Sequence, residues 1–277
     1  MNLLKKITHG KSLRRALLLM GLFSPPALFA QVNVSGKPGL LYIPSARVLA
    51  DGALCVGYTY NPIRYAFRFN NRNSESIYFV NLTLLPRLEI NLNLLIPNGN
   101  VRFQDRGIGD RQIDVKYGIL TEKKLRPAVA VILSMPFGID NSLETYAIAA
   151  TKNIALTESI GVEVTAGVGS PYYVYRDVKN DRNSNIFSGF TLRDKRIKSN
   201  SYLSGPYAGL SLNIRKKAGL LVEWDSQHLN VGAYVTVCKR WTVQGGLLNG
   251  DQVTLGTSYA FSLLRPSKHL ALPHGIH

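Results

Sequence analysis

The sequence is poor in cysteine, with only Cys55 and Cys238 among its 277 residues. Two cysteines cannot supply the dense disulfide framework on which small secreted folds depend, and no Cys/His pair has the spacing of zinc ligands. One disulfide between them is permitted in an oxidising compartment, although both fit equally well as small buried apolar residues. We therefore predict no metal and no cofactor, and leave the pairing of the two thiols open.

Long apolar runs are also missing. After residue 30, no stretch has 18 consecutive apolar residues, so a helical membrane protein is disfavoured. The run ALLLMGLF at 16–23 is far shorter than the ~20 residues that span a bilayer. It follows five basic residues that no acid accompanies, and the SPPALFA segment after it ends in the small residue Ala30. This pattern predicts a cleaved export signal over residues 1–30 rather than a membrane anchor.

Acidic residues are scarce, since 17 Asp and Glu oppose 33 Lys and Arg, for a net charge of +16. Loss of the leader removes five positive charges and leaves 16 − 5 = +11 on the exported chain. Basic proteins bind nucleic acid, anionic lipid or acidic polymers. Because an exported chain rarely meets nucleic acid, we expect anionic lipid or an acidic polymer as partner.

Helical periodicity is absent after the leader, and strand periodicity takes its place. In RLEINLNLLIP, residues 87–97, every second residue from Leu88 is apolar, and Glu89 and Asn91 stand between. This is the period of a strand with one apolar and one polar face. Segments of this kind, near the ~10 residues of a tilted membrane strand, recur along the chain. The predicted strands are 53–60, 76–85, 87–96, 111–120, 127–136, 143–152, 159–168, 206–214, 218–225, 229–237, 240–248 and 252–261.

The polar faces of these strands are sparse in charge and rich in Gly, Asn, Thr and Ser. A soluble sandwich would carry many Lys and Glu on its wet face, whereas a confined barrel interior needs its few charges paired or wetted. We therefore predict that the polar phase lines a lumen and the apolar phase faces lipid. The charged lumen residues, expected to form internal ion pairs or to contact sugar hydroxyls, are Glu89, Asp114, Lys116, Glu144, Glu163 and Glu223.

Aromatic positions and loop lengths agree with this orientation. Rings of the apolar phase, such as Tyr58 and Trp241, lie towards strand ends, as in the aromatic girdles of membrane barrels. Long connections such as 169–205 alternate with short turns such as Pro86. The sequence therefore predicts an all-β fold, a single transmembrane antiparallel barrel of about 12 strands. A soluble secreted β-sandwich is the structural alternative.

No catalytic constellation stands out. His228 follows Asp225 and Ser226 in a short loop, but close neighbours in a tight turn do not by themselves form a nucleophile–base–orienter arrangement. We predict that the protein is not an enzyme. A lipid-modifying barrel enzyme that depends on His228 is the catalytic alternative.

The longest connection, 169–205, carries seven basic and three acidic residues, an excess of four positive charges. On an outer surface these charges would meet lipopolysaccharide phosphates or an acidic glycan. A merely solvated loop explains them as well. The basic residues are Arg176, Lys179, Arg182, Arg193, Lys195, Arg196 and Lys198.

The segment before the first strand, GKPGLLYIPSARVLADG at 36–52, is apolar but not strand-like. An apolar piece at a barrel mouth should not remain in water, and twelve strands leave an interior between a filled small barrel and an open porin. We predict that residues 31–52 form a plug or a periplasmic arm. The barrel then covers 53–262, and 263–277 is a C-terminal tail.

GLLYIPSARVLADGALCVGYT, residues 39–59, resembles a motif of the YjbH family, outer-membrane proteins associated with exopolysaccharide biosynthesis and export. Segments 114–131, 144–152 and 223–235 are similar to later parts of the family in the same order, so the resemblance covers most of the mature chain. The residues that match the first motif are Gly39, Leu40, Pro44, Ala46, Arg47, Asp51 and Gly52.

The resemblance implies a non-enzymatic outer-membrane component of a polysaccharide secretion system in a Gram-negative bacterium. Its implied partners are outer-membrane lipid and lipopolysaccharide, a polysaccharide and other secretion-system proteins. The residues alone indicate export, a barrel and a basic loop, and they leave open a small-solute pore or a passive barrel.

Overall fold

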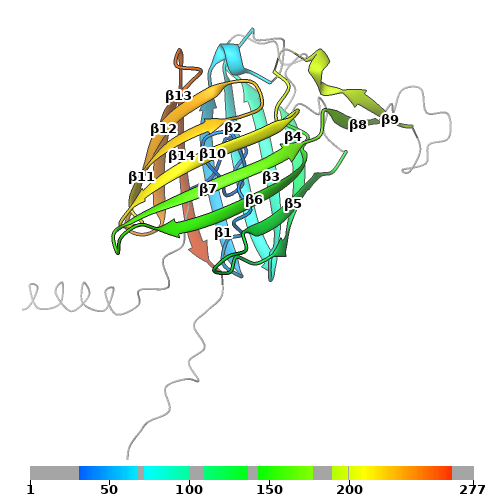
Figure 1. Cartoon of the computed structure of the whole chain (residues 1–277). Helices are drawn as coiled ribbons and strands as arrows, with labels where there is room; N and C mark the ends of the chain where they lie inside the picture. The colour runs from blue at the N-terminus through cyan, green and yellow to red at the C-terminus, as the bar shows by residue number, and fades with distance from the viewer. Residues whose placement is uncertain are drawn as a thin grey trace, which may run out of the picture.

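Twelve antiparallel strands close into a barrel in the computed structural model, which describes residues 31–67, 72–99, 109–136, 143–176, 189–198 and 200–263 (Figure 1). The barrel strands are β1 Ala53–Asn61, β2 Glu75–Leu85, β3 Leu88–Pro97, β4 Asp110–Leu120, β5 Ala128–Ser134, β6 Tyr146–Ala155, β7 Ile160–Gly169, β10 Pro206–Ile214, β11 Ala218–Trp224, β12 Leu229–Val237, β13 Trp241–Leu248 and β14 Gln252–Ser262. Neighbours in sequence are neighbours in the barrel, with β7 beside β10 and β1 closing on β14. The predicted all-β, twelve-stranded barrel is confirmed.

The alternation of side chains explains the pairing register. In β3, Glu89 and Asn91 are buried on the inside, whereas Leu92 is 46% exposed on the outside. The flanking strands set Asn81 of β2 and Asp114 of β4 opposite Asn91. A slip of one residue would turn every polar side chain of a strand outward. Burial of the polar face inside the barrel therefore specifies the register.

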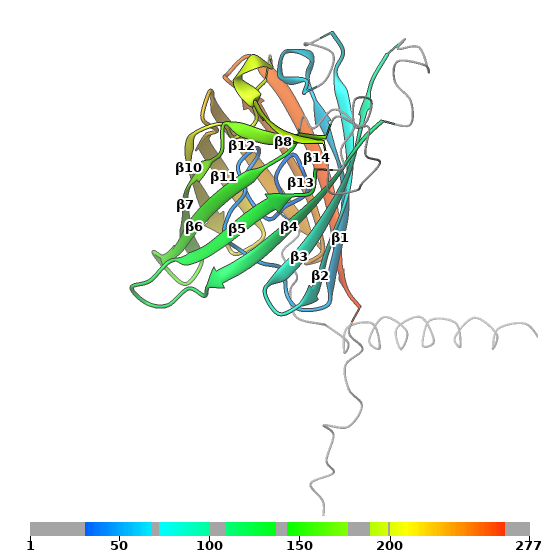
Figure 2. The same ribbon diagram turned by 90° about the vertical axis from the view of Figure 1, so that its right-hand side faces the viewer.

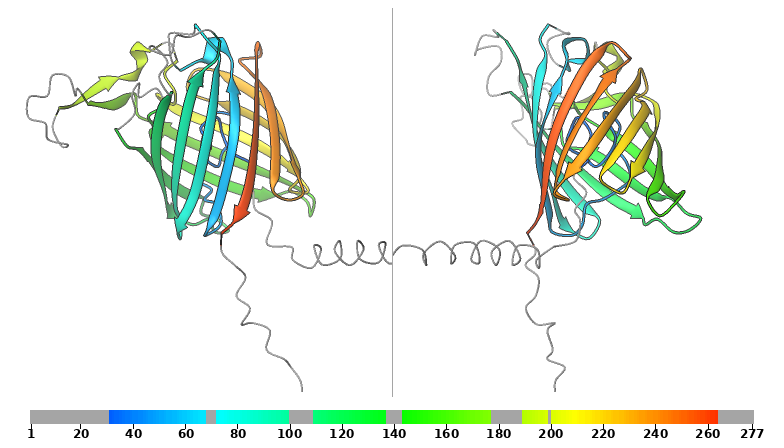
Figure 3. Two further views of the ribbon diagram at one scale, coloured as in Figure 1. Left: turned by 180° about the vertical axis from the view of Figure 1, so that it is seen from behind. Right: turned by 90° about the vertical axis from the view of Figure 1, so that its left-hand side faces the viewer.

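Connections differ at the two ends of the barrel, as the sequence predicted. At one end, the loop end, the chain connects β1 to β2, β3 to β4, β5 to β6, β7 to β10, β11 to β12 and β13 to β14. At the other, the turn end, lie 86–87, 121–127, 156–159, 215–217 and 238–240. Figure 3 shows the barrel from two further sides, with the tight turns at its lower end. Positive φ angles at Arg215 and Lys216 allow one of these tight turns.

Two predicted elements differ from the structure. The strand expected at 143–152 begins at Tyr146 and runs to Ala155, because Thr145 bonds Ser134 partly through the Ser134 side chain. The loop 169–205 contains a separate hairpin of β8 Tyr172–Arg176 and β9 Phe190–Asp194, followed by the 3₁₀ turn Lys195–Ile197. The polar composition of this region predicts a loop without strands, so the hairpin is a difference from the prediction.

Apolar side chains cover the outside of the barrel, and rings mark both of its rims. Tyr78 and Trp224 lie near the loop end, and Trp241 and Tyr259 near the turn end, each between 43% and 48% exposed. An apolar band between two aromatic rims is the surface of a membrane barrel. No helix among the residues described is long and apolar enough to cross a membrane.

Residues 31–50 lie inside the barrel and are called the plug below (Figure 2). The plug passes from the turn end towards the loop end, reverses at 40–43 through a bond from Leu40 N to Ile43 O, and returns to β1. Leu40 and Ile43 pack with inward barrel residues such as Leu95 and Leu221. The main hydrophobic core of the protein therefore lies in the lumen, between the plug and the wall.

Two lumen glycines make this packing possible. A Cβ atom at Gly209 would lie 2.7 Å from Leu40 Cδ2, and one at Gly246 would lie 2.5 Å from Leu41 Cδ1. These distances are shorter than carbon atoms tolerate without displacement. The Gly-rich polar phase of these strands therefore accommodates the plug.

The two cysteines are both free thiols. Cys55 is buried on β1, whereas Cys238 is exposed in the turn between β12 and β13. Cys55 and Cys238, whose pairing the sequence left open, therefore do not form a disulfide with each other.

Candidate functional site

One side of the lumen is hydrophilic. Inward residues of β2, β3 and β4 form rows across the three strands, because Thr83 lies opposite Glu89 and Glu89 opposite Lys116. We call this surface the polar wall. Its residues, each at most 4% exposed, are Asn81, Thr83, Glu89, Asn91, Asn93, Gln112, Asp114 and Lys116.

Two amides of the polar wall, Asn81 and Asn91, use their nitrogens to hold the plug. Asn91 Nδ2 donates to Ser35 O at 2.7 Å, and Asn81 Nδ2 donates to Gly36 O at 3.3 Å. The matching oxygens of both amides are buried without a hydrogen-bond donor in the part of the chain that is described. The same holds for the side-chain oxygens of Asn93 and Gln112. Even with the plug bound, four amide oxygens of the polar wall therefore accept no hydrogen bond from the described residues.

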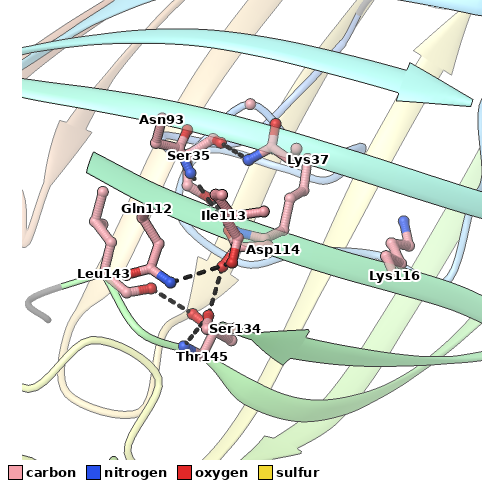
Figure 4. Close-up of polar contacts among 12 residues, drawn as sticks. Ser35, Lys37, Asn93, Gln112, Ile113, Asp114, Lys116, Ser134, Leu143 and Thr145 are labelled. Atoms are coloured by element: carbon pink, nitrogen blue, oxygen red, sulfur yellow. Dashed lines mark hydrogen bonds and ion pairs between the residues drawn. The ribbon is translucent and has the colours of Figure 1, made fainter. Parts of the chain in front are cut away.

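A buried ion pair joins the plug to this wall (Figure 4). Lys37 Nζ lies 2.5 Å from Asp114 Oδ2, and the two side chains are 1% and 0% exposed. Asp114 also accepts a hydrogen bond from Ser134 Oγ at 2.5 Å and one from Asn93 Nδ2 at 3.3 Å. Lys37 Nζ donates further to Ser35 Oγ at 2.8 Å. The charges are compensated, which a buried pair requires.

Glu223 holds the tip of the plug from the opposite side of the barrel. Its carboxylate accepts hydrogen bonds from the backbone N–H groups of Leu41, Tyr42 and Ile43 at 3.0, 2.7 and 3.4 Å. Asn230 Nδ2 donates to the same carboxylate at 3.1 Å. The turn at 40–43 needs partners for these N–H groups because it belongs to no sheet. The Glu223 carboxylate therefore serves as hydrogen-bond acceptor for all three N–H groups.

Charged residues also fix the returning arm of the plug near the turn end. Arg47 Nε lies 3.0 Å from Glu163 Oε2, and Lys116 Nζ donates to the carbonyl of Arg47. Lys116 Nζ is 3.5 Å from Glu89 Oε2, while Glu89 Oε1 accepts from Leu49 N at 2.5 Å. Counting also Asp114 and Glu223, four lumen acids and the three bases Lys37, Arg47 and Lys116 thus anchor a segment that forms no strand.

Aromatic rings close the loop end above the plug. Tyr42 packs against Tyr65, Phe67 and Tyr202, with ring centroids 6.4, 6.0 and 6.1 Å away. The Tyr202 hydroxyl donates to Tyr42 O at 3.0 Å, and the Tyr42 hydroxyl donates to Asn61 Oδ1. Sequence reasoning missed Tyr65, Phe67 and Tyr202, because nothing in a loop sequence indicates which rings meet over a lumen.

Five of the six predicted lumen acids and bases contact the plug directly, namely Glu89, Asp114, Lys116, Glu163 and Glu223. Glu144 differs, because it precedes β6 and lies buried at the loop end, where it accepts from the Tyr146 hydroxyl at 3.3 Å. Of the motif residues, Gly39, Leu40, Pro44 and Ala46 are buried in the plug and Arg47 is partly buried. Asp51 and Gly52 instead form the turn that leads into β1.

The predicted basic loop does not form one exposed patch. Lys195 is 2% exposed and donates to Tyr202 O at 3.0 Å, so this expectation was wrong for Lys195. Arg196 pairs with Asp194, whereas Arg193 lies over the Tyr175 ring and Lys198 over the Tyr173 ring. Lys179 and Arg182 fall outside the described residues, and of Arg176 only the backbone, in β8, is described.

Burial changes the pKa values of two ionisable groups at the loop end, Glu144 and Lys195. Burial raises the pKa of Glu144 to about 8, although the Tyr146 hydroxyl and the positive charges of Lys195 and Lys198 oppose the shift. Burial also lowers the pKa of Lys195 to about 8, with Glu144 acting in the opposite direction. The loop end therefore holds a carboxyl that is protonated well above its usual range.

The raised pKa of Glu144 predicts a pH dependence of stability. The folded state binds this proton more tightly than the unfolded chain, whose carboxyl has the ordinary value of 4.5. Stability should therefore be full below about 4.5 and fall as the pH rises towards about 8. Denaturant unfolding of the chain in detergent micelles across this range measures the slope. Glu144→Gln, which cannot ionise, should flatten it, and an unchanged slope in this variant would contradict the assignment.

No cluster of three or more metal-ligating side chains occurs within the described ranges. Near His228, the Nδ1 atom lies 3.6 Å from Asp225 Oδ1, and the ring meets Tyr65 with centroids 4.8 Å apart. The Ser226 hydroxyl is buried and bonds to no described group, His228 included. The site therefore lacks a bond between nucleophile and base.

Comparison with known proteins places this geometry in context. A family model described as exopolysaccharide biosynthesis protein YbjH, of the YjbH family, matches residues 31–273. No curated protein matches the chain. Among solved structures, the chain is similar to an outer membrane channel from Pseudomonas putida F1, with 14% sequence identity and a TM-score of 0.37, over 78% of this chain and 98% of that one. The family match includes the plug and the whole barrel.

Proposed function

Because the chain belongs to the YjbH family of exopolysaccharide biosynthesis proteins, we propose that it assists the passage or assembly of a polysaccharide at the outer membrane of a Gram-negative bacterium. The protein does so without catalysing a reaction. The apolar outer band carries the barrel in the membrane, with the turn end towards the periplasm and the loop end outside.

The polar wall is the observation that carries this proposal. A lumen that served only as a structural core would be lined by apolar side chains, whereas β2, β3 and β4 present amides and charges along one side. Sugar hydroxyls both donate and accept hydrogen bonds, so they match amide side chains that offer both groups. The wall would exchange its bonds to the plug for bonds to a passing glycan or to water.

Passage requires that the plug move. The plug fills the lumen, yet it joins the barrel covalently only through the turn before β1 and is otherwise held by side-chain contacts. Hydrogen bonds and ion pairs of this kind break and re-form without unfolding the sheet. A small-solute pore would use the same movement, and the identity of the solute separates the two functions.

The hairpin of β8 and β9 supports contact with the outer leaflet. Leu192 and Ile197 are 73% and 76% exposed, and each is followed in the chain by a basic residue, Arg193 or Lys198, which lies over a tyrosine ring. Apolar side chains next to cations suit lipid tails and lipopolysaccharide phosphates. We include lipopolysaccharide as a partner on this ground, and other secretion-system proteins because of the family.

Deletion of the gene in the native host tests the proposed function. We expect high-molecular-weight polysaccharide in the medium to fall several-fold, with or without accumulation in the periplasm, and to return when the intact gene is restored. Quantification of polymer in both fractions is the measurement. Unchanged polymer in both, under conditions in which the host makes it, would overturn the polysaccharide role and favour the small-solute pore.

A further inference from the structure

A hollow of about 720 Å³ opens at the turn end between β6, β7 and β10. Its volume lies within the range of about 300–1,000 Å³ that is typical of ligand sites. The returning arm of the plug borders it through Arg47, and the turn between β10 and β11 forms its rim. Its polar lining residues are Arg47, Asn153, Thr157, Glu158, Ser159, Glu163, Asn213, Arg215 and Lys216.

The hollow contains polar atoms that the protein itself does not satisfy. Glu163 is 1% exposed and uses Oε2 for Arg47, while its Oε1 is buried with no donor from the described residues. Asn213 accepts through Oδ1 from Tyr234 and Ser211, and its Nδ2 donates to no described atom. A buried acceptor without a donor is unfavourable, because it has lost its hydrogen bonds to water. A ligand with hydroxyl groups would supply the missing donor.

The rim of the hollow carries an excess of positive charge, with Arg215 and Lys216 against the single exposed acid Glu158. Arg215 and Lys216 are exposed, and neither forms an ion pair with a described residue. They belong to a wider pattern, since the five turn-end connections carry nine Lys and Arg residues against two Glu. Such an excess attracts anions from solution towards this end of the barrel.

We propose that this hollow binds a segment of an acidic oligosaccharide. A sugar carboxylate forms ion pairs with Arg215 and Lys216, and a hydroxyl of the same segment donates a hydrogen bond to Glu163 Oε1. Cations on the rim and a buried acceptor without a donor in the lining of the same hollow fit a ligand that is both anionic and rich in hydroxyl groups. The inference rests on the proposed function, because it takes a polysaccharide as the ligand class and adds its charge and its first contact site.

Binding to the purified chain in detergent micelles tests this assignment. The probes are an oligogalacturonate, which is acidic, and a malto-oligosaccharide of the same length, which is neutral, titrated by calorimetry. We expect the acidic probe to bind at least about tenfold more tightly. Arg215→Asn with Lys216→Asn should remove about tenfold of that affinity, because charge-assisted bonds are lost. Asn tolerates the positive φ angles of 50° and 55° at these positions.

Lys239→Asn with Arg240→Asn is the matched control. It removes the same charge from another turn at the same end, outside the hollow, and should change affinity by less than about threefold. Equal loss in both double variants would show a diffuse basic rim and overturn the site. Equal affinity for the acidic and the neutral probe would also overturn the site, and so would the absence of binding by either probe. If the probes fail while gene deletion still abolishes polymer export, the hollow assignment fails and the proposed function stands.

Discussion

A barrel that lacks residues 31–50 should conduct ions steadily in a planar bilayer, whereas the intact chain should remain closed. The plug occupies the lumen, and the Tyr42 ring at its tip packs against Tyr65 and Tyr202 at the loop end. Twelve strands enclose more space than lumen side chains alone fill. Single-channel conductance is the measurement, and we expect a rise on the order of tenfold or more over the intact chain.

A second deletion controls for damage to the barrel. Replacement of residues 172–194 by a short Gly-Ser linker removes a segment of similar length, whose strands β8 and β9 form a sheet separate from the barrel. This variant should stay closed. Folding of each variant is checked by its migration on unheated gels. Equal conductance of the intact and plug-deleted chains would show that the plug is not the barrier.

Lys37→Met should lower the free energy of unfolding by about 3–5 kcal/mol, because it leaves Asp114 as an uncompensated buried charge. The two charged groups lie 2.5 Å apart, and both side chains are at most 1% exposed. Ser134 and Asn93 would remain as the only donors to the carboxylate among its described contacts. Denaturant unfolding in detergent micelles measures the loss. Lys37→Met combined with Asp114→Asn should recover more than half of it.

An exposed pair of the same length provides the contrast. Arg64 Nη1 also lies 2.5 Å from Asp251 Oδ2, but these side chains are 70% and 38% exposed. Arg64→Met should therefore change stability by less than about 1 kcal/mol. If Arg64→Met and Lys37→Met were equally mild, or if the double variant were as unstable as the single one, the Lys37–Asp114 pair would not be what holds the plug.

The barrel was predictable because its determinants are local and periodic. The alternation of apolar and polar residues in segments such as 87–97 specifies which side chains face the lumen. The same alternation sets the register of every strand, because a shift by one residue would exchange the inner and outer faces. The same pattern identified Glu89, Asp114 and Glu223 as lumen residues. Glu144 was misplaced because strand ends depend on single hydrogen bonds, such as those between Thr145 and Ser134, that no period reports.

By itself, the sequence determined the strands, their faces, the alternation of loops and turns, and the apolar character of the segment before β1. The contacts of that segment depend on the folded barrel, because they join residues as distant as Leu41 and Glu223 or Lys37 and Asp114. The tertiary structure also decided that Arg215, Lys216 and Glu163 border one hollow. Closure of the barrel brings together residues from distant strands, and pairing across a closed sheet leaves no trace in the spacing along the chain.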